Sequence, residues 1–278
     1  MLLALDTSTS QASVALVRDE RLLAELSWEV GRRHSQELPE RMSQVLRVAG
    51  ARPADLSAVA VALGPGSFNG ARVAVTTAKM LALTLNIPVY GASTLDIIAY
   101  GHAFADGMLL AILEAGRGEL YAGIYAASAI SSAPSHDAHG QPPTALASDL
   151  WRLHGPAITD PEWLAEEIAG AALVCGEWHA ETETRLRAAL GNRVRFAPRL
   201  GGRRAAWLAA LAAARAAHGH GADYDDPARL EPLYLRRPAI TASARPENRA
   251  PTIASVSPTV SPSAASASGS EEGVARAL

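Results

Sequence analysis

The sequence predicts an α/β fold built on a mixed sheet, followed by a C-terminal tail without regular structure. Three observations indicate this. Apolar runs at the start of the chain are separated by turn-forming residues, strands precede each of the first three expected helices, and the aromatic residues stop well before the chain ends. Such alternation of strands and helices is typical of α/β proteins, whose sheets are covered by helices.

The first quarter of the chain predicts three antiparallel strands, a helix and a buried strand. The apolar runs that predict the strands lie at residues 2–5, 13–17, 22–28 and 57–63. A helix is expected over 35–49, because apolar residues recur there at helical spacing. Ser35 is its expected N-cap and Pro39 falls in its first turn, while Gly50 follows its end.

The rest of the chain repeats this alternation with shorter elements. Helices are expected at residues 71–85, 93–104, 161–170, 179–190 and 203–218. Strands are expected at residues 89–91, 108–113, 120–125, 172–175 and 193–196, with a last extended segment at 230–235. Residues 126–147 are rich in Ala, Ser, Pro and His and are predicted to form a loop.

Composition divides the chain into a folded part and a tail. All fourteen aromatic residues lie at or before Tyr234, and the last residues are mostly Ala, Ser, Pro and Thr. Such a segment buries too little apolar surface to offset about 1–2 kcal/mol of backbone entropy per residue. We therefore predict an N-terminal subdomain at 1–105, a smaller C-terminal subdomain at 106–240 and a disordered tail at 241–278.

Charge, hydropathy and cysteine content exclude several classes of protein. The net charge of −3 argues against a chain-wide grip on nucleic acid. No apolar run approaches the roughly 18 residues of a membrane-spanning helix, and the N-terminus lacks the basic start of a secretory signal. The single cysteine, Cys175, cannot form an internal disulfide or a zinc cluster. A cytoplasmic protein is expected.

The sharpest local feature is the segment Gly64-Pro65-Gly66-Ser67-Phe68-Asn69-Gly70, between a strand and a helix. Its glycines allow a tight turn, and the following helix N-terminus offers free N–H groups to an anion. The spacing is neither that of a P-loop nor that of the dinucleotide fingerprint. A turn that merely joins strand to helix explains the segment equally well.

A second feature is the turn after the first strand, where Asp6 and Thr7 begin a run of hydroxyl residues. A carboxylate followed by hydroxyls can hold a metal–phosphate group, but ordinary turn chemistry explains the run better. The two features together predict one candidate cofactor-binding set, as vestigial phosphate loops. It contains Asp6, Thr7, Gly64, Gly66, Ser67 and Gly70.

No catalytic residue and no metal site are expected. None of the eight histidines lie four residues apart, as pairs of metal ligands on a helix do. Cys175 lies in an apolar run and is predicted to be a packed thiol. Glu114, Arg117 and Glu119 surround a hairpin tip and are interpreted as a solvated turn rather than an acid–base pair.

Several of these segments together resemble the TsaB family, the dimerisation subunit of bacterial tRNA N6-threonylcarbamoyladenosine (t6A) synthesis. They occur in the family's order: LALDTSTSQASVAL, HSQELPERMSQVL, SAVAVALGPGSFNGARVAVTTAKMLAL, VYGASTLDIIA, ILEAGRGELYAGIY and LEPLYLR. The resemblance is dense over about 1–126 and thin over 171–236. It implies the actin-like ATPase (ASKHA, RNase H-like) fold with two α/β subdomains.

The resemblance also implies partners. A TsaB-like scaffold without catalysis of its own pairs with TsaD and recruits the ATPase TsaE in modifying adenosine 37 of tRNA. TsaD carries a histidine pair in the segment that corresponds to Ala92–Ile97, where this chain has none. Contact with tRNA is expected through the complex, ATP at the level of the complex, and a homodimer when the chain is alone.

In the family, the first two helices build the subunit interface. Here the expected interface residues are Leu38, Met42, Ala71, Ala74, Ala78 and Ala82, with the alanines as an exposed stripe of small residues. Ordinary core packing explains that stripe equally well. Asn69 and Ala71 depart from the Thr and the larger apolar residue expected at those positions.

Two other functions remain open at this stage. The first is an independent actin-fold enzyme, such as a small-molecule kinase or a carbamoyltransferase. The second, weaker one is a glycoprotease-type activity, for which the sequence shows no recognisable peptidase site.

Overall fold

The computed structural model describes residues 1–31, 33–105, 107–127, 143–147, 150–198, 205–217 and 226–236. They belong to one compact unit, Met1–Pro238. Most of the loop predicted at 126–147 and the whole tail predicted at 241–278 lie outside the described residues.

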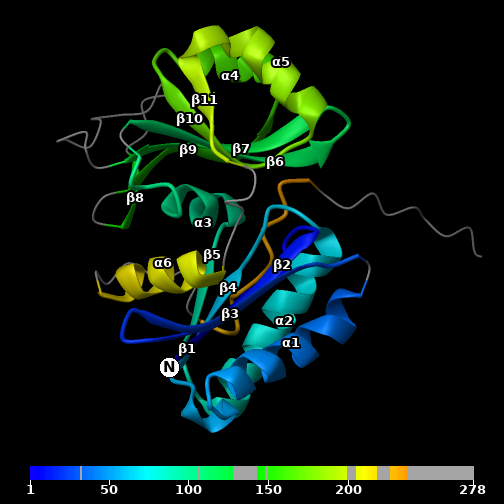
Figure 1. Cartoon of the computed structure of the whole chain (residues 1–278), viewed down its shortest axis with the longest axis vertical. Helices are drawn as coiled ribbons and strands as arrows, with labels where there is room; N and C mark the ends of the chain where they lie inside the picture. Colours follow the sequence, from blue (N-terminus) through cyan, green and yellow to red (C-terminus); the bar gives the residue numbers. More distant parts are fainter. Residues whose placement is uncertain are drawn as a thin grey trace, which may run out of the picture. The chain divides into compact units, whose positions relative to one another are not determined.

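The first sheet begins with the predicted meander. Its strand order is β3-β2-β1-β4-β5, antiparallel from β3 to β1 and parallel from β1 to β5. The strands are β1 (Leu2–Asp6), β2 (Gln11–Arg18), β3 (Arg21–Glu29), β4 (Ala58–Ala62) and β5 (Val89–Ala92). Helices α1 (His34–Val48) and α2 (Phe68–Leu85) lie together on one face of this sheet (Figure 1). The predicted order of these elements is confirmed.

The two faces of the first sheet differ in side-chain size because the strands alternate. Leu3 and Leu5 pack with Val59 and Val61 against α1 and α2. Ala4, between the two leucines, points to the opposite face with other alanines and packs in a separate cluster. Small side chains on that face allow a helix to lie close to the sheet.

The second sheet has six described strands in the order β11-β10-β6-β7-β9-β8. They are β6 (Met108–Gly116), β7 (Glu119–Ala127), β8 (Thr144–Ala147), β9 (Leu150–Thr159), β10 (Ala172–Glu177) and β11 (Val194–Phe196). Helices α4 (Pro161–Glu167) and α5 (Ala180–Leu190) cover its outer face (Figure 1). Two short 3₁₀ turns lie in connections: η1 (Pro53–Asp55) between α1 and β4 of the first sheet, and η2 (Gly191–Arg193) between α5 and β11.

Two helices lie between the sheets. They are α3 (Thr94–Tyr100) and α6 (Ala205–Ala217), which share one buried cluster with the inner faces of both sheets (Figure 1). Cys175 is part of this cluster and is fully buried, as predicted for a packed thiol. The predicted boundary between residues 105 and 106 falls between α3 and β6, and the division into subdomains stays a prediction.

Helix α1 differs from its prediction at its start. It begins at His34 after Arg33, which makes no side-chain cap, so the N-cap predicted at Ser35 is wrong. Pro39 consequently lies in the interior, where its missing N–H removes one intrahelical hydrogen bond. Helix α2 begins at Phe68, three residues earlier than predicted, because the Ser67 side chain accepts a hydrogen bond from the Gly70 N–H.

The loop predicted at 126–147 is wrong at both ends. Strand β7 runs to Ala127, and Thr144–Ala147 forms β8. Strand β9 (Leu150–Thr159) was missed altogether, because Gly155-Pro156 at its centre is typical of a turn. The segment is nevertheless a strand, because it pairs with β7 on one side and with β8 on the other.

Candidate functional site

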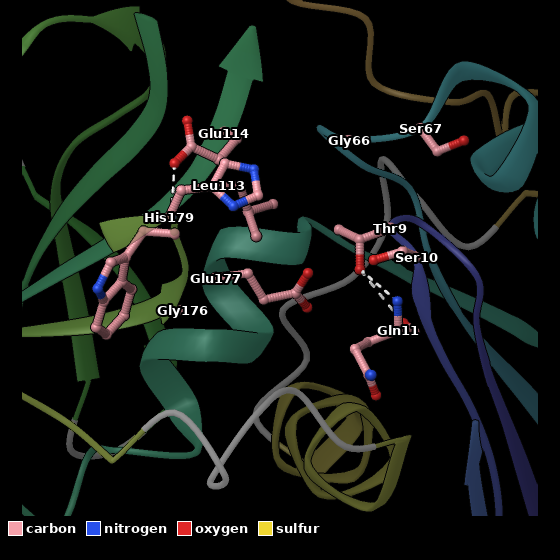
Figure 2. Close-up of a pocket in the computed structure, with 11 residues that line it drawn as sticks. Thr9, Ser10, Gln11, Gly66, Ser67, Leu113, Glu114, Gly176, Glu177 and His179 are labelled. Atoms are coloured by element: carbon pink, nitrogen blue, oxygen red, sulfur yellow. Dashed lines mark hydrogen bonds between the residues drawn. The ribbon is translucent and has the colours of Figure 1, made fainter. Parts of the chain in front are cut away.

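A pocket of about 420 Å³ lies where the end of β1 and the glycine-rich loop face the second sheet (Figure 2). Its size is in the range of small-molecule sites. The first sheet's side contributes hydroxyl, amide and glycine residues, and the second sheet's side contributes two carboxylates. The lining residues are Thr9, Ser10, Gln11, Gly66, Ser67, Leu113, Glu114, Gly176, Glu177, Trp178 and His179.

The turn after β1 is fixed by the side chain of Asp6, the last residue of that strand. Asp6 is fully buried, and its Oδ1 accepts hydrogen bonds from the Ser8 N–H at 3.0 Å and the Ser8 hydroxyl at 2.7 Å. The Thr94 hydroxyl at the start of α3 donates to the Ser8 hydroxyl at 2.8 Å. The Asp6 carboxylate therefore fixes the turn and links it to α3.

The glycine-rich loop packs directly on this turn. The Thr7 hydroxyl donates to the Gly70 carbonyl at 2.7 Å, and the Ser67 N–H donates to the Ser8 carbonyl. A Cβ at Gly66 would collide with the Ser8 carbonyl oxygen, and a Cβ at Gly70 with that of Thr7. Glycine is required at both positions because the two backbone segments touch there.

The six residues predicted as phosphate loops are therefore brought together, but in two different roles. Gly66 and Ser67 line the pocket. The other four hold the turn and the loop to each other or to neighbouring elements; they are Asp6, Thr7, Gly64 and Gly70. Nucleotide binding by this set stays a prediction, and the mutual contacts give these residues a structural role that needs no ligand.

Sequence reasoning missed the second wall of the pocket. Glu114, interpreted above as part of a solvated turn, accepts a hydrogen bond from the His179 N–H at 2.8 Å (Figure 2). It also accepts one from the Thr182 hydroxyl at 2.7 Å. Its carboxylate thus lies at the positive N-terminus of α5. No signal in a single segment could have found this contact, because His179 and Thr182 lie 65 and 68 residues from Glu114 along the chain. Glu177 extends from β10 toward Thr9 and Ser10 (Figure 2).

His34 is a buried titratable residue beside the glycine-rich loop. A Cβ at Gly70 would lie 3.1 Å from the imidazole Cε1, and the Nδ1 atom has no hydrogen-bond partner within the described part of the chain. Burial lowers the pKa of His34, and the Glu37 carboxylate opposes this shift. Folding therefore favours the neutral form of this imidazole more than the unfolded chain does.

Acidification should weaken the fold through His34. Because its pKa is lower in the folded state, the unfolded chain binds its proton first, so stability is lost as the pH falls below about 6.5. We expect the melting temperature of the unmodified chain to fall more between pH 7 and pH 5.5 than that of His34→Gln. Parallel pH profiles of the two proteins would contradict this assignment.

The structure buries the four alanines of α2 that were expected to form an exposed stripe. Ala74, Ala78 and Ala82 pack in the cluster beneath the first sheet together with Leu38, Met42 is half-buried against that cluster, and Ala71 is buried at the start of α2. The alanines pack inward because their small side chains let α2 approach the strands closely. The large apolar residues that α1 and α2 do expose are Val48, Phe68, Met80 and Leu83, of which Phe68 packs on Tyr234.

Comparisons with known proteins agree on one family. The family model described as "TsaD: tRNA N6-adenosine threonylcarbamoyltransferase" matches residues 28–146. The TsaB protein of Bacillus subtilis is 37% identical over 124 residues, 45% of this chain and 54% of its own length. The TsaB protein of Escherichia coli is 36% identical over 122 residues, 43% of this chain and 52% of its own length. This chain thus spans about half the length of these two relatives.

Two further relatives extend the similarity over most of the chain. An uncharacterized protein of Mycobacterium tuberculosis is 31% identical over 238 residues, 85% of this chain and 92% of its own length. The solved structure of YeaZ from Pseudomonas aeruginosa matches with a TM-score of 0.65 and 27% identity, covering 84% of this chain and 99% of that one.

The two sheets with their helices and the neighbouring structure define an actin-like ATPase (ASKHA) fold with two α/β parts, as predicted. The turn after β1 and the glycine-rich loop lie together at the pocket of this fold. The chain belongs to the TsaB family. Relatives of that name are described as tRNA threonylcarbamoyladenosine biosynthesis proteins.

Proposed function

We propose that this chain is a non-catalytic scaffold of the t6A37 tRNA modification system. It pairs with the threonylcarbamoyltransferase TsaD, and the pair recruits the ATPase TsaE. Contact with tRNA and use of ATP belong to the complex, and the chain alone forms a homodimer. The observation that carries the proposal is an exposed apolar face on the two helices that cover the first sheet.

That face consists of Val48 on α1 with Met80 and Leu83 on α2. Their exposed fractions are 74%, 59% and 65%, whereas the alanines on the opposite side of α2 are buried. Met80 and Leu83 lie three residues apart and therefore share one side of α2. Contiguous exposed apolar patches are typical of protein–protein contacts. Because α1 and α2 are otherwise well packed on the sheet, the face can bind a partner without rearrangement of the core.

Met80→Arg should reduce the affinity for TsaD at least tenfold, because a charged guanidinium would be buried at the centre of an apolar contact. Isothermal titration of the purified proteins measures the affinity. Ala78 is unsuitable for this test, because it is fully buried and a large side chain there would disrupt the core.

The matched control is Ala188→Arg, which places the same side chain on an exposed position of α5. It should bind TsaD with unchanged affinity. If Met80→Arg and Leu83→Arg also bind normally while retaining their circular dichroism spectra, the partner does not dock on this face.

A cytoplasmic location follows from the proposed function, because tRNA is modified there. No helix in the described part of the chain is long and apolar enough to cross a membrane.

A further inference from the structure

The last described segment, residues 226–236, is here called the strap. It forms neither helix nor strand, and it begins with a turn in which Asp226 accepts hydrogen bonds from the N–H groups of Ala228 and Leu230. It runs beside the first sheet and then reaches the hairpin of β6 and β7 (Figure 1). Its contacts with the first sheet are buried, whereas its described contacts with the hairpin of the second sheet are partly exposed.

On the first sheet, the strap is bound by buried contacts. The Leu230 side chain is buried and packs over Gly91, where an added Cβ would lie 2.8 Å from it. The carbonyl of Leu230 accepts a hydrogen bond from Lys79 Nζ at 3.1 Å, and the Leu233 N–H donates to the Leu63 carbonyl at 2.7 Å. This part of the strap is therefore fixed to the first sheet.

On the second sheet, the contacts of the strap within the described residues come from the Arg236 side chain. The guanidinium of Arg236 forms an ion pair with Glu119 and donates to the Ala115 carbonyl at 3.4 Å. The exposed fractions of the Arg236 and Glu119 side chains are 33% and 41%, so water and salt compete for this contact.

These contacts lie beside the pocket on both of its walls. The Tyr234 ring packs on Phe68 with centroids 4.8 Å apart, and Phe68 directly follows Ser67 of the pocket. Arg236 contacts Ala115, which directly follows Glu114 of the pocket. The end of the strap thus connects one wall of the pocket to the other.

A second connection between the sheets is buried and has several bonds. The Asp96 carboxylate on α3 accepts hydrogen bonds from the Tyr125 hydroxyl at 3.0 Å, from Arg152 at 3.1 Å and from Arg215 at 3.0 Å. Tyr125 and Arg152 belong to the second sheet, while Arg215 on α6 also donates to the Gly91 carbonyl of the first sheet. We call these four side chains the Asp96 cluster.

We propose that the strap controls the opening of the pocket: the Arg236–Glu119 ion pair holds the two walls together, and its release lets them separate about the Asp96 cluster. The difference between the two connections supports this division of roles. The Asp96 cluster is buried and held by several hydrogen bonds, so it persists when a single exposed ion pair breaks.

The test measures the distance between the two sheets by double electron–electron resonance. Spin labels are attached to the full chain at Ala54→Cys in η1 and Ala188→Cys in α5, both exposed positions outside the proposed partner face. Cys175 does not interfere, because it is fully buried and burial raises the pKa of its thiol. An excess of unlabelled chain removes distances between molecules.

We expect one narrow distance distribution for the unmodified strap and an additional, longer population for Arg236→Ala and for Glu119→Gln. Sodium chloride at 1 M should produce the same longer population, and Arg236→Lys should restore much of the narrow one. Glu162→Gln is the control, because it makes the same substitution in the exposed Arg185–Glu162 pair, which lies within the second sheet's part and does not involve the strap. Its distribution should not change.

An unchanged distribution in both Arg236→Ala and Glu119→Gln would overturn the proposal. So would an equal broadening in Glu162→Gln, because the effect would then not depend on the strap. Melting temperatures of all variants are measured beside the distances, and only variants that keep a cooperative transition are compared. If Arg236→Ala does not fold, Glu119→Gln and the unmodified chain in 1 M sodium chloride decide the test.

Discussion

Replacing Asp96 by asparagine should lower the free energy of unfolding by about 3–5 kcal/mol, the range for removing one partner of a buried ion pair. The Asp96 side chain is only 3% exposed, and it balances the guanidinium groups of Arg152 and Arg215. Asparagine keeps the shape but removes the charge, so two mostly buried guanidinium groups lose the carboxylate that they share. Urea unfolding at neutral pH, followed by circular dichroism, measures the loss.

Two variants separate the charge of Asp96 from its hydrogen bonds. Tyr125→Phe removes one donor and no formal charge, so it should cost about 1 kcal/mol. Glu162→Gln removes an exposed ion pair and should change stability much less than Asp96→Asn. A loss for Asp96→Asn no larger than that for Glu162→Gln would show that the Asp96 cluster does not stabilise the fold.

Gly70→Ala should destabilise the chain by about 1–3 kcal/mol, as expected for an added methyl group in a packed interior. The new Cβ would collide with the Thr7 carbonyl oxygen and would lie 3.1 Å from the His34 ring. Gly70 lies in the first turn of α2, where alanine favours the helix by up to about 1 kcal/mol. A measured loss therefore reports the contact between the loop and the turn rather than helix propensity.

Gly170→Ala is the control for this substitution. Nothing lies within 4 Å of a Cβ built at Gly170, and its φ is not in the left-handed region. Thermal unfolding should show a melting temperature close to that of the unmodified chain. An equal or higher melting temperature for Gly70→Ala would mean that the turn and the loop do not touch as described.

The fold could be predicted from the sequence where the local pattern and the tertiary packing agree. The alternation in β1 and β4 and the helical spacing in α1 and α2 place their apolar residues on faces that the structure buries. Strand β9 could not be predicted, because Gly155-Pro156 is typical of a turn and only pairing with its neighbours makes the segment a strand. The start of α1 was predicted after Ser35 because serine is a typical N-cap. The helix instead begins at the buried His34, and the preceding Arg33 makes no side-chain cap that a sequence pattern could indicate.

The candidate site could be predicted only in part. Asp6 and the glycine-rich loop were found because turn formers and glycines are visible in a single segment. Glu114 was missed because its partners, His179 and Thr182, lie more than sixty residues away. The alanines of α2 were left open between an interface and core packing, because a stripe of small residues looks the same whether it faces a partner or a sheet; the structure buries them.

The central claim is that this chain supports t6A formation without catalysing it, and reconstitution tests it most directly. Threonylcarbamoyl transfer to an unmodified tRNA is followed by mass spectrometry with TsaD and TsaE, in the presence or absence of this chain. We predict product only when the chain is present, much less product with Met80→Arg, and neither transfer nor ATP turnover by the chain alone. Turnover by the isolated chain, or full transfer without it, would contradict the claim.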